Sequence, residues 1–181
     1  MQALGMREDG LREVEPVLQV DPAELFGARL PVLSGAGAPA GRQLRALAEW
    51  MRRAQPRWRV LSPFVRFDPQ SYVRETLFRS PDWELVLLCW GPEHASRIHD
   101  HGGSSGVARV LWGEAQEQRF LRSGPGHAVP SARVSLQEGG VLVEASATVH
   151  QLRNVSREPA LTLHLYSPPL AGMQQYLPAP H

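Results

Sequence analysis

The sequence predicts a mainly β domain, a sandwich or barrel, with a helical and irregular segment in front of it. After about residue 58, short apolar or alternating runs follow one another, and clusters of Gly, Pro, Ser and Asp separate them. Before that point the apolar residues recur at helical spacing or show no periodicity. No helical run lies between the strand-like runs, which counts against a parallel α/β fold.

The chain is expected to form one domain in two parts. Residues 1–57 form a helical and irregular segment on the outside, and residues 58–181 form the β core. Asp21 has the form of a helix cap, because Pro22 follows it and Glu24 stands three residues after it.

The other predicted elements are one more helix and six strands. An amphipathic helix is expected over residues 42–54, with Pro56 ending the pattern. Its apolar positions recur at helical spacing: Leu44, Leu47, Ala48 and Met51. The strands are expected over residues 83–90, 106–122, 132–136, 141–144, 149–155 and 160–166.

Composition narrows the class of partner. The 19 Lys and Arg and the 18 Asp and Glu leave a net charge of +1, which argues against a nucleic-acid or anionic-membrane surface and favours small molecules. Cys89 is the one cysteine, so no internal disulfide can form and a reducing compartment fits best. No run reaches the roughly 18 apolar residues of a membrane span. The N-terminus lacks the apolar region of a signal peptide, and a cytoplasmic location is expected.

Three histidines, here called the histidine cluster, are candidate metal ligands: His99, His101 and His150. In a strand, His99 and His101 point to the same side while Ile98 and Asp100 point away. A barrel can bring the distant His150 beside them, and neutral imidazole is the commonest metal ligand. The alternative is two surface histidines in a turn and a half-buried His150 bonded to a backbone carbonyl.

A second group, here called the polar triad, alternates with leucines near the C-terminus. Thr162, His164 and Tyr166 share one face of the predicted strand, and leucines at 161, 163 and 165 share the other. If the leucines fill a packing layer, the triad lines the interior, where its members can satisfy each other's hydrogen bonds as a relay. The alternative is a solvated polar face.

With these motifs, the chain resembles the cysteine dioxygenase family over roughly residues 64–170. Members of that family are single-domain cupins with an all-histidine iron site, so the resemblance implies a cupin β-barrel of the jelly-roll type. The similar segments are Tyr72 with Arg74, Cys89-Trp90-Gly91, His99-Asp100-His101, His150 through Asn154, and Thr162 through Pro169.

The resemblance also implies roles for single residues. The histidine cluster would hold Fe(2+), and Arg74, near Tyr72, would bind the carboxylate of L-cysteine. The substrate thiolate and amine would chelate the iron, and O2 would convert the thiol to a sulfinic acid. The polar triad would orient the reactants and manage protons. The family is often monomeric, and its Ser-Pro bond at the position of Ser167–Pro168 is cis.

Four departures from related patterns carry information. General cupins have a metal-binding Glu a few residues after the histidine pair, where this chain has Ser105 and Gly106, so no carboxylate is expected at the metal. The mammalian members have, at the place of Gly106, a cysteine crosslinked to the tyrosine, so Tyr166 is expected to be an ordinary phenol. Glu93 stands where a glycine is usual, and Thr162 where the family has serine.

Three alternatives stay open at the level of sequence. The substrate could be another small thiol such as 3-mercaptopropionate, although enzymes resembling that branch usually carry glutamine at the place of Arg74. The chain could be a metal-binding cupin without catalysis, such as a ligand sensor. It could also be a zinc or nickel isomerase-type cupin, because three imidazoles alone do not select iron. The polar triad and Arg74 favour an enzyme.

Overall fold

The structure is a computed structural model, and it describes residues 17–33 and 37–180. Its helices are α1 (Pro22–Phe26), α2 (Gly41–Arg53), α3 (Trp58–Leu61) and the 3-10 turn η1 (Ser62–Phe64). Its strands are β1 (Val17–Leu18), β2 (Val73–Arg79), β3 (Glu84–Trp90), β4 (Ile98–His99), β5 (Ser105–Trp112), β6 (Glu114–Gly124), β7 (His127–Gln137), β8 (Val141–Glu144), β9 (Val149–Arg153), β10 (Ala160–Ser167) and β11 (Gln175–Pro178).

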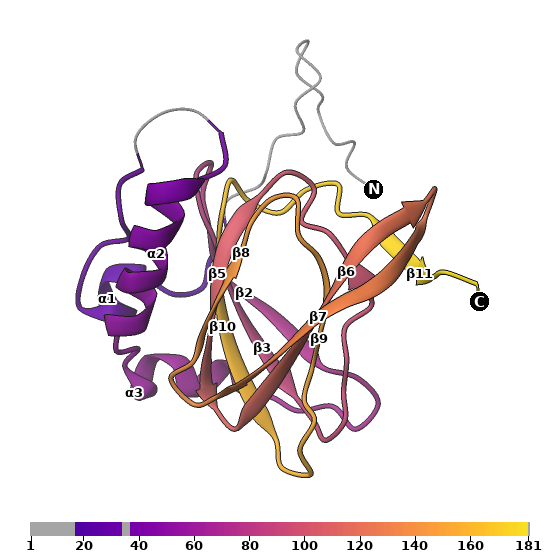
Figure 1. Cartoon of the computed structure of the whole chain (residues 1–181). Helices are drawn as coiled ribbons and strands as arrows, with labels where there is room; N and C mark the ends of the chain where they lie inside the picture. The colour runs from indigo at the N-terminus through magenta and orange to yellow at the C-terminus, as the bar shows by residue number, and fades with distance from the viewer. Residues whose placement is uncertain (1–16, 34–36, 181) are drawn as a thin grey trace, which may run out of the picture.

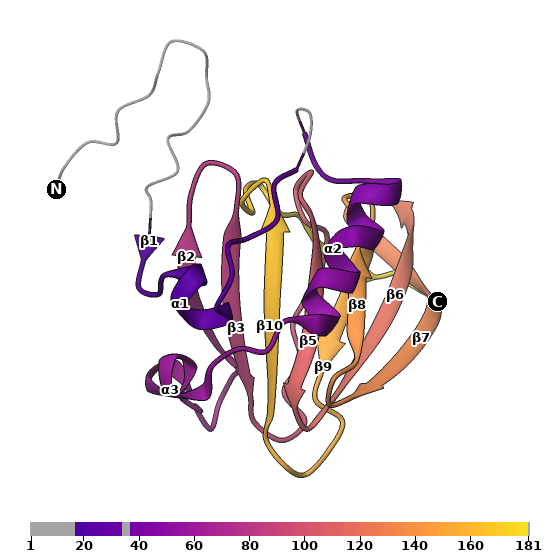
Figure 2. The same ribbon diagram turned by 90° about the vertical axis from the view of Figure 1, so that its left-hand side faces the viewer.

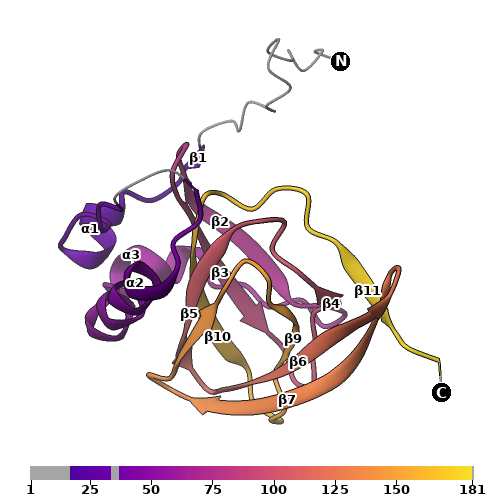
Figure 3. The same cartoon turned by 45° about the horizontal axis from the view of Figure 1, so that its top comes forward.

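The strands form two facing sheets that enclose one interior (Figures 1 and 3). The first sheet has the order β1-β2-β3-β10-β5-β8, and its neighbours pair in antiparallel fashion. The second has the order β11-β4-β9-β6-β7 and closes on itself, because β11 also pairs in parallel with β7. The predicted mainly β barrel with helices outside is confirmed.

The helices cover the outer face of the first sheet (Figure 2). Strand β10 shows why they do so, since its leucines at 161, 163 and 165 are buried in one apolar cluster with Leu47 and Met51 of α2. The cap predicted for α1 is present: the Asp21 carboxylate accepts a hydrogen bond of 2.8 Å from the backbone N–H of Ala23, and Gly27 ends the helix in the left-handed region.

The structure corrects the predicted strands in two places. The run at 106–122 is two strands, because Gly113 turns the chain at a φ of +76° and a Cβ there would lie 2.7 Å from a backbone oxygen. Strands β1, β2, β4 and β11 lie outside the six predicted runs. Among the helices that the structure describes, none is long and apolar enough to cross a membrane.

Candidate metal centre

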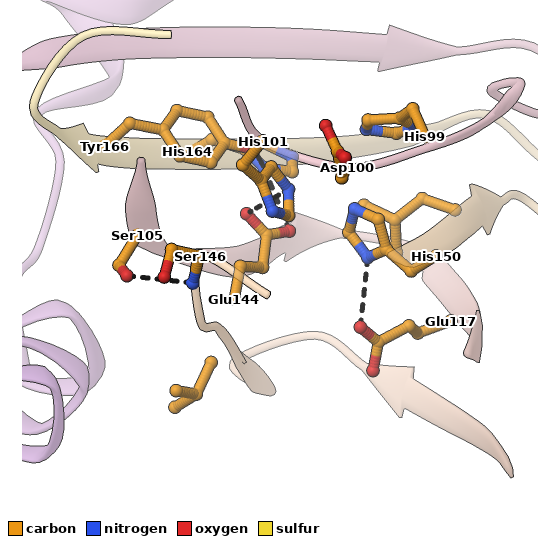
Figure 4. Close-up of polar contacts among 12 residues, drawn as sticks. His99, Asp100, His101, Ser105, Glu117, Glu144, Ser146, His150, His164 and Tyr166 are labelled. Carbon is orange, nitrogen blue, oxygen red and sulfur yellow. Dashed lines mark hydrogen bonds and ion pairs between the residues drawn. The ribbon is translucent and has the colours of Figure 1, made fainter. Parts of the chain in front are cut away.

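The histidine cluster meets inside the barrel, where β4 and β9 of the second sheet pair (Figure 4). His99 on β4 pairs directly with His150 on β9, and His101 follows two residues after β4. The ring centroids lie 4.8 Å apart for His99 and His150, 4.7 Å for His101 and His150, and 5.6 Å for His99 and His101. One nitrogen from each ring lies within 4.8 Å of the others, a spacing that one metal ion can bridge.

Neighbouring acceptors orient two of the rings. His99 Nδ1 lies 2.7 Å from the carbonyl oxygen of Arg97, and His150 Nδ1 lies 3.0 Å from Oε1 of Glu117. Both partners can only accept, so Nδ1 carries the proton in each ring and Nε2 keeps its lone pair. A histidine that donates its other N–H to a carbonyl or carboxylate is the usual second layer of a protein metal site.

The protonation of the cluster also suits a metal. Burial lowers the pKa of His101 to about 4, and burial together with the nearby His150 lowers the pKa of His99. Neutral imidazoles at pH 7 offer lone pairs to a cation without first having to lose a proton.

Several buried polar atoms at this place have no hydrogen-bond partner among the described residues. They include both ring nitrogens of His101, Nε2 of His150 and both carboxylate oxygens of Glu144. Buried polar groups are normally hydrogen-bonded, and each exception requires an explanation. A cation bound by one nitrogen each of His99, His101 and His150 would give a partner to two of these atoms, one on His101 and Nε2 of His150, so the three imidazoles fit a divalent metal ion.

Two buried carboxylates lie beside the cluster, although the described residues whose ligand atoms could share one metal ion are the three histidines. Glu144, at the end of β8, is fully buried, with Oε2 3.7 Å from Nε2 of His101 and Oε1 3.6 Å from Nδ1 of His164. Glu117 on β6 is also fully buried, and its Oε2 accepts a 2.8 Å hydrogen bond from Arg119. Both carboxylates reach the histidines from other strands, so they lie far from the HDH motif in sequence.

Asp100 turns away from the metal-facing side, as predicted. Its Oδ2 accepts hydrogen bonds from the hydroxyl of Tyr176 at 2.8 Å and from Arg122 at 3.0 Å. Its Oδ1 accepts from the backbone N–H groups of Gly102 and Gln174. The residue between the two histidines therefore ties their turn to the C-terminal strand β11.

The polar triad forms a continuous hydrogen-bonded chain. The indole N–H of Trp90 donates to Oγ1 of Thr162 at 2.9 Å, and that oxygen lies 2.8 Å from Nε2 of His164. Nδ1 of His164 lies 3.0 Å from the hydroxyl of Tyr166. Burial and then the Glu144 carboxylate raise the pKa of Tyr166 well above its ordinary value, so the phenol stays protonated at neutral pH.

Arg74 and Tyr72 line the same small cavity as the histidines. This cavity has a volume of about 70 Å³, and its walls also include His99, His150 and Tyr166. Arg74, Tyr72 and His99 also line a wider neighbouring space of about 460 Å³. The ring of Tyr72 stacks on Trp90 with centroids 4.6 Å apart, which explains how this side chain is fixed.

A buried carboxylate orients Arg74. Glu84 is fully buried, and its Oε1 accepts from Nη2 of Arg74 at 2.6 Å while its Oε2 accepts from Arg79 at 2.8 Å and from the backbone N–H of Leu170 at 2.9 Å. Nη1 of Arg74 also donates to Thr76 at 2.8 Å. Arg74, Arg79 and Glu84 are called the arginine group below.

Three further residues or bonds can be compared with what the sequence indicates. Glu93 has a φ of 60°, the left-handed region where glycine is favoured, which accounts for a glycine at that place in related patterns. The Ser167–Pro168 bond is cis, as expected. Cys89 is buried, and burial raises the pKa of its thiol, consistent with an unreactive core residue.

Sequence comparisons place the chain among known proteins. The family model described as Cysteine dioxygenase type I matches residues 42–178. Cysteine dioxygenase type 1 of Danio rerio is 35% identical over 122 residues, which cover 62% of this chain and 59% of that protein. The Homo sapiens protein of the same name is 30% identical over 132 residues, or 70% of this chain and 64% of that protein. The chain thus spans less than two thirds of the length of these curated relatives.

Solved structures share the fold. A Klebsiella pneumoniae protein described as having a double-stranded β-helix domain superposes with a TM-score of 0.56 at 19% identity, covering 65% of this chain and 94% of that one. A Thermus thermophilus protein gives a TM-score of 0.52 at 25% identity, covering 60% of this chain and 94% of that one. These matches agree with the predicted cupin barrel.

Proposed function

This chain belongs to the cysteine dioxygenase family, and from that premise we propose that it is an iron(II)-dependent dioxygenase that converts L-cysteine to cysteine sulfinic acid. The reaction is R–SH + O2 → R–SO2H: sulfur loses four electrons, O2 gains them, and no further reductant is needed. The observation that carries the proposal is the convergence of three imidazole nitrogens beside a cavity that His99, His150 and Arg74 line.

In this proposal His99, His101 and His150 hold the metal through the nitrogens that face one another. Three neutral imidazoles leave the charge of the ion uncompensated, which suits an anionic ligand. A bound iron(II) would lower the pKa of the thiol, so that thiolate forms at neutral pH, and would supply the redox chemistry with O2.

Arg74 would bind the substrate carboxylate, with Tyr72 beside it. Its guanidinium has five N–H donors, of which Glu84 and Thr76 take two, so donors remain for a carboxylate. Lys could not match that planar pair of donors. Because Glu84 also pairs with Arg79, the arginine group keeps a net positive charge toward the cavity.

The polar triad would position a proton donor at the hydroxyl of Tyr166. The raised pKa keeps this phenol protonated, and His164 and Thr162 hold it in place through the hydrogen-bonded chain from Trp90. We assign Tyr166 the donation of a hydrogen bond to the substrate carboxylate or to the reacting oxygen atoms, with His164 and Thr162 in support.

The proposal also includes the domain organisation, oligomeric state and cellular location of the protein. We propose a single domain in which the described part of residues 1–57, namely 17–33 and 37–57, packs on the barrel of residues 58–180, acting as a monomer in the cytoplasm on a small thiol and O2; residues 1–16, 34–36 and 181 lie outside the described residues. The packing of α2 on β5 and β8 and the single buried cysteine support these assignments.

An oxygen-electrode screen of iron-loaded protein with L-cysteine, 3-mercaptopropionate and cysteamine tests the proposal. We expect L-cysteine to give the fastest uptake, with one O2 consumed per thiol and the sulfinic acid as product. Faster uptake with 3-mercaptopropionate would assign the other thiol. No uptake with any thiol, or disulfide as the only product, would contradict a dioxygenase.

A further inference from the structure

Glu84 is a buried carboxylate that contacts two residues of the cavity wall. Its side chain is fully buried, and it accepts hydrogen bonds from Nη2 of Arg74 at 2.6 Å and from Nη2 of Arg79 at 2.8 Å. The backbone N–H of Leu170 also donates to it, at 2.9 Å. Arg74 and Leu170 both line the cavity of about 70 Å³ beside the histidine cluster, whereas Glu84 does not. The carboxylate thus contacts this wall without being part of it.

The strand pairing explains why both arginines reach this one carboxylate. Arg74 and Arg79 stand five positions apart on β2, and in a regular strand such residues point to opposite faces. The register between β2 and β3 shifts between Thr76 and Phe78, and this irregularity reverses the alternation. Arg79 is then the direct cross-strand partner of Glu84. Both guanidinium groups therefore contact the same side chain.

The backbone of Leu170 is held by two side chains at once. Its N–H donates to Oε2 of Glu84 at 2.9 Å, and its carbonyl oxygen accepts from Nη2 of Arg79 at 3.0 Å. The same guanidinium nitrogen donates to Oε2 of Glu84, so the three residues form a closed ring of hydrogen bonds. Leu170 lies between β10 and β11, so Glu84 connects this segment to the strand that carries Arg74.

The orientation of Arg74 depends mainly on Glu84. The side chain of Arg74 is 38% exposed, so without a fixed partner its guanidinium can turn into the solvent. Its other contact, from Nη1 to Oγ1 of Thr76, is with a neutral group, and a hydrogen bond to a carboxylate is the stronger one. A guanidinium that is already fixed loses less conformational entropy when it binds a ligand.

We propose that Glu84 is a positioning residue that sets the selectivity of the cavity for thiols that carry a carboxylate. It holds the guanidinium of Arg74 ready for that carboxylate and fixes the backbone of Leu170 at the same small cavity. This inference rests on the proposed function, in which Arg74 binds the carboxylate of L-cysteine. The effect of Glu84 on the substrate passes through these two neighbours.

Anaerobic titration of the Co2+-loaded full-length protein with two thiols tests the proposal. L-Cysteine has a carboxylate, and cysteamine has the same thiol and amine without it. In Glu84→Gln, one acceptor oxygen is replaced by an NH2 group, which faces another donor. We expect affinity for L-cysteine to fall about 10-fold, because a displaced binding group recognises its ligand poorly, while affinity for cysteamine changes less than about twofold.

Glu84→Asp separates orientation from charge. Glu84→Gln raises the net charge of the arginine group by one, and charge alone would strengthen the binding of an anion. Glu84→Asp keeps the charge but is one methylene shorter, so it cannot reach all three donors at once. Positioning therefore predicts weaker L-cysteine binding in both variants. Tighter or unchanged binding in Glu84→Gln, or wild-type affinity in Glu84→Asp, would overturn the proposal. If Glu84→Gln does not fold, the result for Glu84→Asp decides alone.

Glu75→Gln is the matched control. Glu75 is a largely buried carboxylate on β2 that pairs with Arg66, and strand alternation places it on the face opposite to Arg74. This variant removes a carboxylate–arginine pair from the same sheet away from the cavity, so both affinities should stay at wild-type values. The same selective loss of L-cysteine binding in Glu75→Gln would show that general loosening of the sheet, and not Glu84, sets the selectivity.

The two proposals fail in different ways. If Glu84 is not a positioning residue, its variants keep the wild-type preference for L-cysteine over cysteamine, while iron-loaded wild type still oxidises a thiol. If only the proposed dioxygenase activity is wrong, iron-loaded wild type oxidises no thiol, yet the Glu84 variants still lose affinity for L-cysteine. A wild type that binds both thiols equally would overturn the inference together with the role assigned to Arg74.

Discussion

The two ends of the cavity differ in how fully the protein satisfies them. At the arginine group, the buried carboxylate of Glu84 accepts hydrogen bonds from two guanidinium groups and a backbone N–H. At the histidine cluster, the buried carboxylate of Glu144 and the ring nitrogens of His101 have no such partners in the described chain.

The two ends therefore differ in whether the folded protein alone supplies hydrogen-bond partners for their buried polar groups. In the arginine group, the folded protein itself supplies hydrogen-bond partners to the buried carboxylate. The guanidinium of Arg74 is therefore held in a fixed position in which it can bind an anion. The histidine cluster becomes complete only when a cation enters it, because unpaired buried polar groups are costly. A variant at one end should therefore change metal binding, and a variant at the other should change substrate binding alone.

The largest effect is expected at His101. His101→Ala removes a ligand nitrogen from the cluster, so iron binding should be lost and thiol oxidation should fall by ~10³-fold or more. Metal content after purification and oxygen uptake measure this. If His101→Ala keeps its iron and most of its activity, the histidine cluster is not the metal-binding end of the cavity.

Arg74→Gln should instead leave metal content unchanged. Loss of charge-assisted hydrogen bonds to the substrate carboxylate, about 1.5–3 kcal/mol, predicts a fall in kcat/KM for L-cysteine of about 10- to 100-fold. Turnover of cysteamine, which has no carboxylate, should change much less. Arg79→Gln is the comparison variant: Arg79 pairs with the same Glu84 but does not line the cavity, so it should lower kcat/KM for L-cysteine less than Arg74→Gln does. An equal fall in kcat/KM for L-cysteine and cysteamine would show that Arg74 does not bind the substrate carboxylate.

Glu117 is expected to act on the metal indirectly. Glu117→Gln weakens the acceptor that fixes Nδ1 of His150, so metal affinity should fall about 10-fold, and kcat at saturating iron should stay near wild type. Isothermal titration with Co2+ and kinetics at high iron separate the two quantities. A large loss of kcat that iron does not restore would show that Glu117 acts in the reaction itself.

The smallest effect on activity at neutral pH is expected from protonation of the metal-free cluster. His101 has a pKa of about 4 in the folded state against an ordinary 6.5, so the unfolded chain binds more protons between these values. The stability of metal-free protein should therefore rise with pH from about 4 to 6.5, by up to about 3 kcal/mol. Urea unfolding at several pH values measures this, and His101→Gln should flatten the slope. The same slope in both proteins would contradict the assignment.

Local patterns in the sequence were sufficient to predict many of the helices and strands and the faces that they bury. The alternation in β10 placed the leucines and the polar triad on opposite faces, and the Asp21 cap predicted the start of α1. Among the unpredicted strands, β2 and β11 carried weaker signals. Strand β2 has charged residues at its inward and outward positions alike, and β11 is short and ends in Pro178, which is unusual in a strand.

The candidate site was predictable only where its residues share a motif or a strand. His99 and His101 stand two positions apart, and the polar triad alternates along one strand. Glu117 and Glu144 lie on other strands, and their place beside the histidines depends on the pairing of β6 with β9 and of β5 with β8. No spacing along the chain encodes that register, so the sequence alone does not predict that either carboxylate lies beside the histidines.

Mass spectrometry of the product formed under ¹⁸O2 gas tests the central claim most directly. Iron-loaded protein supplied with L-cysteine should release a sulfinic acid in which both oxygen atoms on sulfur carry the label, and His150→Ala should release none. A product with one labelled oxygen, with oxygen from water, or with sulfur joined to sulfur would contradict a dioxygenase built on these three histidines.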